Sequence, residues 1–115
     1  ARSAPPPGGM MKTSSLVLLC LSLAGAPAFA EEAADIWRAK CKSCHGDTGN
    51  ADTREGTKHK VPDITTEQWQ SGHTDDEIRK VIRDGVKDTK MKAFKDKYSD
   101  QEIEALVKYV RSLRK

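Results

Sequence analysis

Cys41-Lys42-Ser43-Cys44-His45 is the stretch of this 115-residue chain that decides which fold the rest must adopt. Two cysteines separated by two residues, followed at once by a histidine, form the pattern that covalent haem attachment requires. The two thiols reach the two vinyl groups on one edge of a porphyrin, and the histidine then lies beneath the iron. We expect the neutral imidazole of His45 to be the proximal iron ligand and its other ring nitrogen to donate a hydrogen bond. Cys41 and Cys44 are the expected thioether links.

Three other uses of the two cysteines fit the sequence less well. A redox dithiol is expected in a thioredoxin-like βαβ context, and no strand-rich region surrounds Cys41. A zinc site needs further ligands, usually a second pair of similar spacing, whereas His59 and His73 stand alone. A disulfide between Cys41 and Cys44 would close a very short loop and would leave His45 without a role.

The start of the chain reads as an export signal. Lys12 is followed by an apolar run over residues 16–24, and Ala28-Phe29-Ala30 precedes two glutamates. A positive start, a short apolar core and an Ala-x-Ala end are typical of a secretory signal peptide, and this core is too short to span a membrane. We expect an upstream leader plus signal peptide over residues 1–30, cleavage near Ala30, and a periplasmic domain over residues 31–115 without stable membrane insertion.

Cleavage would change both the cysteine count and the charge. Cys20 leaves with the signal, so Cys41 and Cys44 are the only thiols of the mature chain, and no separate structural disulfide can stabilise it. Loss of Arg2 and Lys12 leaves 18 basic against 17 acidic residues, a balance that indicates no nucleic-acid partner. A small exported domain with few large apolar side chains needs another stabilising body, and a covalent haem supplies one.

The mature chain is predicted to consist of helices joined by loops. Residues 33–40 have apolar side chains at helical spacing, so we expect a first helix that runs directly into the attachment motif. Residues 46–62 contain glycines and a proline without a sustained apolar period, which predicts a loop. Residues 63–69 are predicted to form a short helical segment with Asp63 or Thr65 as its cap.

Two capping boxes predict the helices that follow. Thr74-Asp75-Asp76-Glu77 opens a helix that should end at Gly85, because a threonine and a glutamate at this spacing satisfy the first amides of a helix. Its apolar stripe is Ile78, Val81 and Ile82. Ser99-Asp100-Gln101-Glu102 opens the last helix in the same way. The apolar residues of that helix repeat at helical spacing: Ile103, Leu106, Val107, Val110 and Leu113.

Between these two helices lies Met91, the only methionine that cleavage leaves in the chain. A single methionine on a segment predicted as a loop is unlike the methionines that fill gaps in cores, although that use stays open. Its thioether is a soft ligand suited to the sixth position of haem iron.

Together with the motif, these residues resemble a class I (mitochondrial-type) cytochrome c in its short monohaem bacterial form, over residues 33–113. The resemblance implies an all-α fold in which about four helices wrap around one covalently attached haem. It implies that Met91 is the distal iron ligand opposite His45. It also implies that Trp69 reaches a haem propionate, with an ordinary half-buried aromatic as the alternative. The first and last helices would cross where Ala33 and Trp37 meet Leu106 and Tyr109.

One position departs from the family pattern. A proline usually follows the ligand methionine, and Lys92 stands there instead, which predicts a distal loop less rigid than is typical. His59 and His73 are then alternatives to Met91 as the sixth ligand. Bis-histidine ligation would lower the reduction potential, because methionine stabilises the reduced iron better than a second imidazole does.

With both axial positions filled by side chains, the iron would have no open position for oxygen or a substrate. We therefore expect an electron-transfer protein rather than an enzyme, acting as a periplasmic one-electron carrier. Two other classes stay open. One is a haem-bearing subunit of an oxidase or dehydrogenase complex, and the other is a bis-histidine or open-site haem protein of the sensor or peroxidase-like kind.

Five lysines surround Met91 in the sequence and predict a docking patch for acidic surfaces of redox protein partners. They are Lys87, Lys90, Lys92, Lys95 and Lys97. The alternative is an ordinary solvated loop, since Asp88 and Asp96 dilute the positive charge. We expect the carrier to be a monomer.

Overall fold

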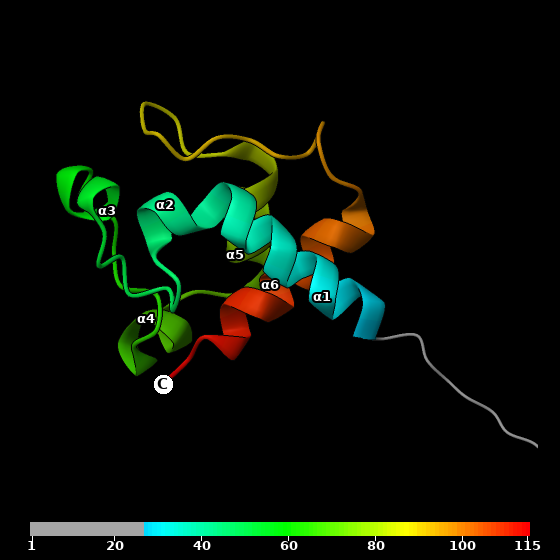
Figure 1. Ribbon diagram of the computed structural model, residues 1–115, viewed down its shortest axis with the longest axis horizontal. Helices are drawn as coiled ribbons and strands as arrows, with labels where there is room; N and C mark the ends of the chain where they lie inside the picture. Colours follow the sequence, from blue (N-terminus) through cyan, green and yellow to red (C-terminus); the bar gives the residue numbers. More distant parts are fainter. Residues whose placement is uncertain (1–26) are drawn as a thin grey trace, which may run out of the picture.

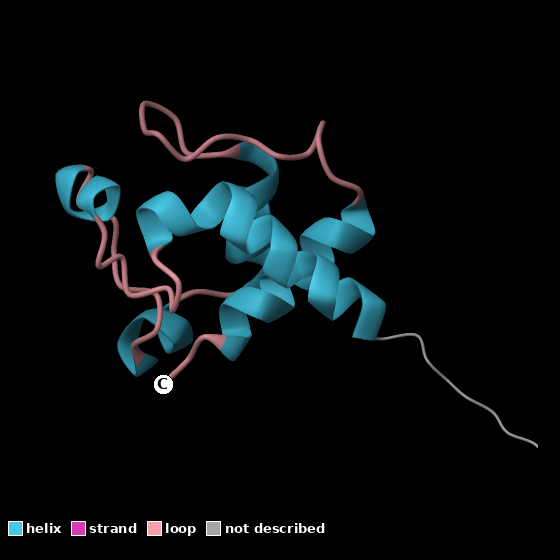
Figure 2. Ribbon diagram, viewed as in Figure 1, coloured by secondary structure: helices cyan, strands magenta, loops and turns pink. Residues whose placement is uncertain are grey.

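The computed structural model describes residues 27–115, which contain helices and no strands (Figures 1 and 2). The elements are α1 (Pro27–Ile36), the π-helical segment η1 (Trp37–Cys41), α2 (Lys42–His45), α3 (Arg54–Lys58), α4 (Glu67–Gly72), α5 (Asp75–Asp84) and α6 (Asp100–Ser112). The leader and most of the expected export signal, including its apolar run and Cys20, lie outside the described residues. In the part described, no helix has the length and apolar character needed to cross a membrane.

The helix expected to lead into the attachment motif is present, and it is longer than expected. It begins at Pro27, and α1, η1 and α2 follow one another without leaving the right-handed helical region, up to Gly46. The η1 segment was not predicted: the Lys42 amide donates to the Trp37 carbonyl, five residues back. Such π turns are rare inside α-helices and occur often at functional sites. Here the turn ends at the first cysteine of the motif.

Both predicted capping boxes are confirmed. The Thr74 amide donates to Glu77 Oε1 at 2.9 Å, and the Glu77 amide donates to Thr74 Oγ1 at 3.1 Å. Ser99 and Glu102 make the same pair of bonds at 2.8 Å and 3.1 Å. These bonds satisfy amides that have no partner inside the helix, so α5 and α6 begin where the sequence predicts.

The core lies where α1 packs against α6 (Figure 1). The rings of Trp37 and Tyr109 are 5.2 Å apart, and Ala33 and Leu106 are almost completely buried in the same cluster. This agrees with the expected crossing of the first and last helices. The rest of the core is supplied mainly by aliphatic side chains: Ile36, Ile64, Ile78, Ile82, Phe94, Ile103, Val107 and Val110.

Two local predictions were wrong. The stretch 46–62 is not loop throughout, because it contains α3, whose cap Thr53 accepts a hydrogen bond from the Gly56 amide at 2.8 Å. The cap of α4 is Thr66, which accepts from the Trp69 amide, and not Asp63 or Thr65. Asp63 instead accepts from the Thr65 amide and hydroxyl, an arrangement that forms a turn before the helix.

Candidate haem site

The two cysteines of the motif are free thiols, both half-buried, at the junction of η1 and α2. Their spacing of three residues in helical backbone puts both on one side of the helix, about one turn apart. Burial raises the pKa of the Cys41 thiol to about 11. The Cys41 side chain is therefore a neutral thiol at neutral pH, and it packs against the margin of the core.

His45 ends the same helix beside Trp37, with 5.6 Å between the two ring centroids. Burial lowers the pKa of His45, so that its imidazole is neutral at neutral pH, which is the form that ligates metals. Its Nδ1 atom is buried and has no hydrogen-bond partner among the described residues. The hydrogen bond expected from the second ring nitrogen is therefore not formed in this structure. A half-buried imidazole with a buried, unsatisfied nitrogen is what a site for a metal-bearing group would present.

The backbone around the motif is fixed by contacts from three directions. The Trp37 indole donates to the Gly46 carbonyl at 3.0 Å in a buried hydrogen bond. The Ala51 amide donates to the His45 carbonyl at 2.7 Å. The Thr53 hydroxyl donates to the Cys44 carbonyl at 3.2 Å. These bonds set the end of α2 in place without using any side-chain donor atom of the motif.

The α3 segment packs so closely on the motif that only glycine fits at one position. A Cβ atom at Gly56 would lie 2.4 Å from the Cys44 carbonyl oxygen and 2.4 Å from the Ala51 carbonyl oxygen. This contact was not predicted, although Thr53, three residues before Gly56, is a recognisable capping signal. The predicted loop is therefore a structured support for the attachment site.

Met91 lies on the loop after α5 and is half-buried against the core cluster that also receives Cys41 and Trp69. The loop closes on itself, because the Val86 amide donates to the Met91 carbonyl at 3.0 Å. The Thr89 hydroxyl accepts from the Met91 amide at 3.1 Å. The backbone next to Met91 is thus held by hydrogen bonds although Lys92 replaces the family's usual proline.

The two remaining histidines lie in different surroundings. His59 Nε2 is 3.1 Å from Glu55 Oε2, and His59 lines a surface cavity of about 370 Å³ together with Asp88, Thr89 and Lys90. The end of α3 and the Met91 loop therefore face each other across this cavity. Neither the contact with Glu55 nor the position at the cavity directs a ring nitrogen of His59 toward the motif.

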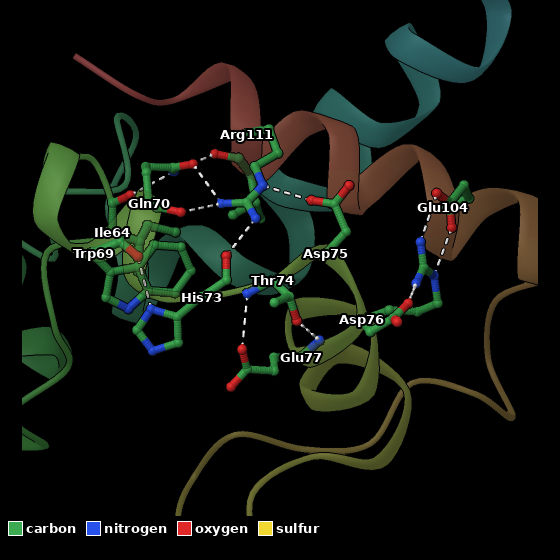
Figure 3. A network of polar contacts seen from close by, with 12 residues as sticks. Ile64, Trp69, Gln70, His73, Thr74, Asp75, Asp76, Glu77, Glu104 and Arg111 are labelled. Atoms are coloured by element: carbon green, nitrogen blue, oxygen red, sulfur yellow. Dashed lines mark hydrogen bonds and ion pairs between the residues drawn. The ribbon is translucent and has the colours of Figure 1, made fainter.

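His73 stacks on Trp69 with ring centroids 4.4 Å apart (Figure 3). Its Nδ1 donates to the Trp69 carbonyl at 2.8 Å, and Nε2 takes no part in this bond. Trp69 is half-buried at the margin of the core, so one part of its indole is available to a bound group. The two aromatic rings form one unit on α4 and the residue that follows it.

The five lysines of the expected docking patch are all exposed. Lys95 forms a 3.7 Å ion pair with Asp84, and Lys90 lines the cavity opposite His59. Two large apolar side chains in this region are also exposed: Val81 at 37% and Val86 at 42%. Val81 belongs to the apolar stripe expected on α5, and no expectation was attached to Val86. Both lie next to the turn that carries the Met91 loop.

The donors present in this part of the chain fit a haem better than a bare metal ion. No group of three or more histidine, cysteine, aspartate or glutamate side chains is arranged to hold a metal within residues 27–115, so the zinc alternative gains no support there. A covalently attached porphyrin with two axial ligands requires two thiols, a neutral imidazole and a second ligand. The thiols of Cys41 and Cys44 on one side of the helix, the imidazole of His45 and the thioether of Met91 match these requirements.

Comparison with known proteins identifies the fold. A family model described as "Cytochrome C oxidase, cbb3-type, subunit III" matches residues 28–110. The solved structure of KustC0563, a c-type cytochrome, superposes with a TM-score of 0.67 and 31% sequence identity, covering 72% of this chain and 98% of that one. These matches confirm the expected family, the all-α fold and the covalently bound haem c. The chain therefore belongs to the family of the cbb3-type oxidase subunit III cytochrome domains, as a small class I-like c-type cytochrome that carries electrons.

Proposed function

We propose that the protein is a periplasmic one-electron carrier whose haem c is linked to Cys41 and Cys44, with His45 and Met91 as axial ligands. The observation that supports this most strongly is the half-buried, neutral imidazole of His45, whose buried Nδ1 atom has no partner within residues 27–115, beside two free thiols at the end of one continuous helix. Hydrogen bonds from Trp37 and Thr53 hold the backbone that carries these side chains.

The haem supplies the one-electron chemistry of its iron, and the chain supplies position and tuning. The thioether links prevent dissociation of the haem. The His45 imidazole is kept neutral by burial and is oriented by the Trp37 ring beside it. The Met91 thioether, held by its closed loop, would favour the reduced iron. If His45 and Met91 both hold the iron, no position would be left for oxygen or a substrate, so we propose that the protein is not an enzyme.

Visible spectra of the purified holoprotein test the axial ligands. The oxidised protein should show the weak red-end band of a methionine–ferric iron bond, and Met91→Ala should lose it and bind carbon monoxide promptly when reduced. His59→Gln and His73→Gln are the matched controls and should keep the wild-type spectrum. Loss of the band in either histidine variant, or its persistence in Met91→Ala, would overturn the assignment of Met91.

A second candidate function is favoured by the family match. The matching model describes a subunit of a cbb3-type oxidase, so the domain is also proposed as a haem-bearing part of such a complex. Gel filtration of a native extract, followed through haem absorbance, separates the two candidates. A free carrier elutes at the size of a monomer, whereas an oxidase subunit elutes with oxidase activity.

We further propose that the lysines near Met91 guide anionic partners. The rate of electron transfer to ferricyanide, an anionic oxidant, should fall as ionic strength rises. Lys90→Glu and Lys92→Glu should lower that rate and weaken its salt dependence, whereas Lys108→Glu on α6 should change both less. An equal effect of all three substitutions would mean that only net charge matters.

We also propose that export ends with cleavage after Ala30. Among residues 29–36 of α1, the first buried one is Ala33, which is 1% exposed, whereas Phe29 is 46% exposed. Removing residues before Glu31 therefore leaves the buried face of α1 intact. The intact mass of the protein from a periplasmic fraction should correspond to a chain that starts at Glu31. An uncleaved chain, or recovery only with the cytoplasm, would contradict the proposal.

A further inference from the structure

Arg111, in the last turn of α6, donates hydrogen bonds to three separate parts of the chain (Figure 3). Its Nη1 donates to the Gln70 carbonyl at 2.7 Å and to Gln70 Oε1 at 3.1 Å. Its Nη2 donates to the His73 carbonyl at 2.5 Å, and its Nε donates to Asp75 Oδ1 at 2.7 Å. One guanidinium thus joins the end of α6 to α4, to the connection after it and to the start of α5.

Gln70 extends this network into the core. Its side chain is buried, and its amide nitrogen donates to the Ile64 carbonyl at 2.8 Å and to the Val110 carbonyl at 3.0 Å. Every polar atom of the Gln70 side chain is therefore bonded. A buried amide with all its partners in place fixes the backbone around it, because losing any one bond leaves a buried polar group unsatisfied.

Trp69 lies in the middle of this arrangement. Its neighbour in the chain is Gln70, and its ring stacks on His73, so both backbone carbonyls that Arg111 binds belong to residues next to Trp69 in sequence or in space. The helix that carries Trp69, α4, has six residues. A helix of this length is not stable by itself in water, and its orientation depends on tertiary contacts.

We propose that Arg111 is a positioning residue: through Gln70 and His73 it holds Trp69 at the angle needed to contact a haem propionate. The inference rests on the proposed function, because the propionate contact that the family resemblance implies for Trp69 requires the haem proposed there. Arg111 itself need not touch the haem. Its planar fork binds two carbonyls and a carboxylate at once, which the single ammonium of a lysine cannot do.

The chain offers a matched control at Arg114. This arginine also joins the end of α6 to α4, through a close ion pair with Glu67. Both side chains of that pair are largely solvent-exposed, and Arg114 makes no contact with Gln70 or His73 among the bonds that the structure describes. Exposed pairs of this kind contribute little to stability. Arg111→Lys and Arg114→Lys both keep the positive charge, so they differ only in which bonds are lost.

The experiment uses the haem-loaded protein in five forms: wild type, the single variants Arg111→Lys, Arg114→Lys and Trp69→Phe, and the double variant that combines Arg111→Lys with Trp69→Phe. Haem content is measured first, and failure of the wild type to bind covalent haem would reject the proposed function rather than this inference. The readouts are then the indole N–H signal of Trp69 in a ¹H–¹⁵N spectrum and the reduction potential. The chain has only two tryptophans, so the signal can be assigned with Trp69→Phe.

Arg111→Lys should move the Trp69 indole signal, speed its hydrogen exchange and shift the reduction potential in the same direction as Trp69→Phe does. Arg114→Lys should leave all three unchanged. In the Trp69→Phe background, Arg111→Lys should cause no additional shift of the potential. The inference is overturned if Arg111→Lys only lowers the melting temperature while the indole signal and potential stay as in wild type. It is also overturned if its shift of the potential is the same with and without Trp69.

Discussion

Trp37 and His45 show how a single residue next to the motif decides the geometry of the site. The Trp37 ring contacts both His45 and Tyr109, so the same side chain belongs to the core and to the site. Its indole N–H also satisfies the Gly46 carbonyl directly after the motif. Any change at Trp37 therefore affects stability and the orientation of the proximal ligand together.

Trp37→Phe tests this double role. Phenylalanine keeps most of the apolar contact but removes the Trp37 hydrogen bond to the Gly46 carbonyl, which keeps only the longer bond of 3.3 Å from the Gly49 amide. The loss should cost about 0.5–1.5 kcal/mol of unfolding free energy. Chemical denaturation of the holoprotein measures the loss. The same variant should also hold the His45 ring less firmly. We expect this to appear as broader lines in the low-temperature electron paramagnetic resonance spectrum of the ferric iron. An unchanged denaturation midpoint would show that the Trp37–Gly46 bond contributes nothing.

At the scale of elements, the Met91 loop depends on a glycine in the left-handed region. Gly85 has φ +72°, and a Cβ atom there would lie 2.7 Å from the Met91 carbonyl oxygen and 2.8 Å from the Ala93 amide nitrogen. The loop thus folds back over the end of α5 at a distance that only glycine permits.

Gly85→Ala should therefore disturb the distal ligand from outside the site. We expect a loss of more than about 1 kcal/mol of stability and a decrease of the methionine–iron band, measured in the same thermal titration. Gly72→Ala is the matched control, since a Cβ atom there meets nothing within 4 Å. That variant should keep the band and the stability of the wild type. If both variants behave alike, the close return of the loop is not what holds Met91.

The elements that could be predicted are those whose signals lie within a few residues of each other. The capping boxes at Thr74 and Ser99 and the motif itself are of this kind, and they placed α5, α6 and the candidate site. The α3 helix was missed because it is held by a cap and by close packing of Gly56 on Cys44, not by an apolar period.

The contacts of Arg111 were beyond sequence reasoning for a different reason. Its partners are carbonyls about forty positions away, at Gln70 and His73. Every residue has a backbone carbonyl, so no sequence pattern indicates which carbonyls an arginine will bind. The axial roles of His45 and Met91 stay predictions, because they concern bonds to a group that the chain alone does not contain.

At the scale of the whole molecule, ion pairs connect helices that the core already brings together. Arg79 on α5 binds Glu104 on α6 with two bonds of 2.8 Å and 2.9 Å, and Arg83 pairs with Asp100. The hydrogen bond from Arg79 lowers the pKa of Glu104 below its ordinary value of 4.5. In the folded state Glu104 therefore binds a proton less readily than in the unfolded chain.

The direction of the pH effect follows from that difference. A carboxyl group whose pKa is lowered by folding stabilises the native state above pH 4.5, and this contribution disappears as pH falls through the lowered pKa. Glu104→Gln should lower the melting temperature slightly at pH 7 and should reduce the further decrease between pH 4.5 and pH 2, followed by circular dichroism. Asp96→Asn, in an exposed loop, serves as the control. Identical pH profiles for wild type and Glu104→Gln would contradict the prediction.

The π turn at η1 is equivalent to one residue inserted into the continuous helix formed by α1 and α2. Each residue of an α-helix turns the chain by about 100°. The Trp37–Lys42 bond therefore determines how the face of α1 that packs on the core is rotated relative to the face of α2 that bears the motif. Deleting Ala39, which is exposed, would turn this bond into an ordinary α-helical hydrogen bond between residues four positions apart, and the rotation between the two faces would stay the same. The shortened protein should attach haem at the wild-type level, whereas adding an alanine there should abolish attachment. Losing one residue here and gaining one should therefore have opposite consequences for the face on which the cysteines lie.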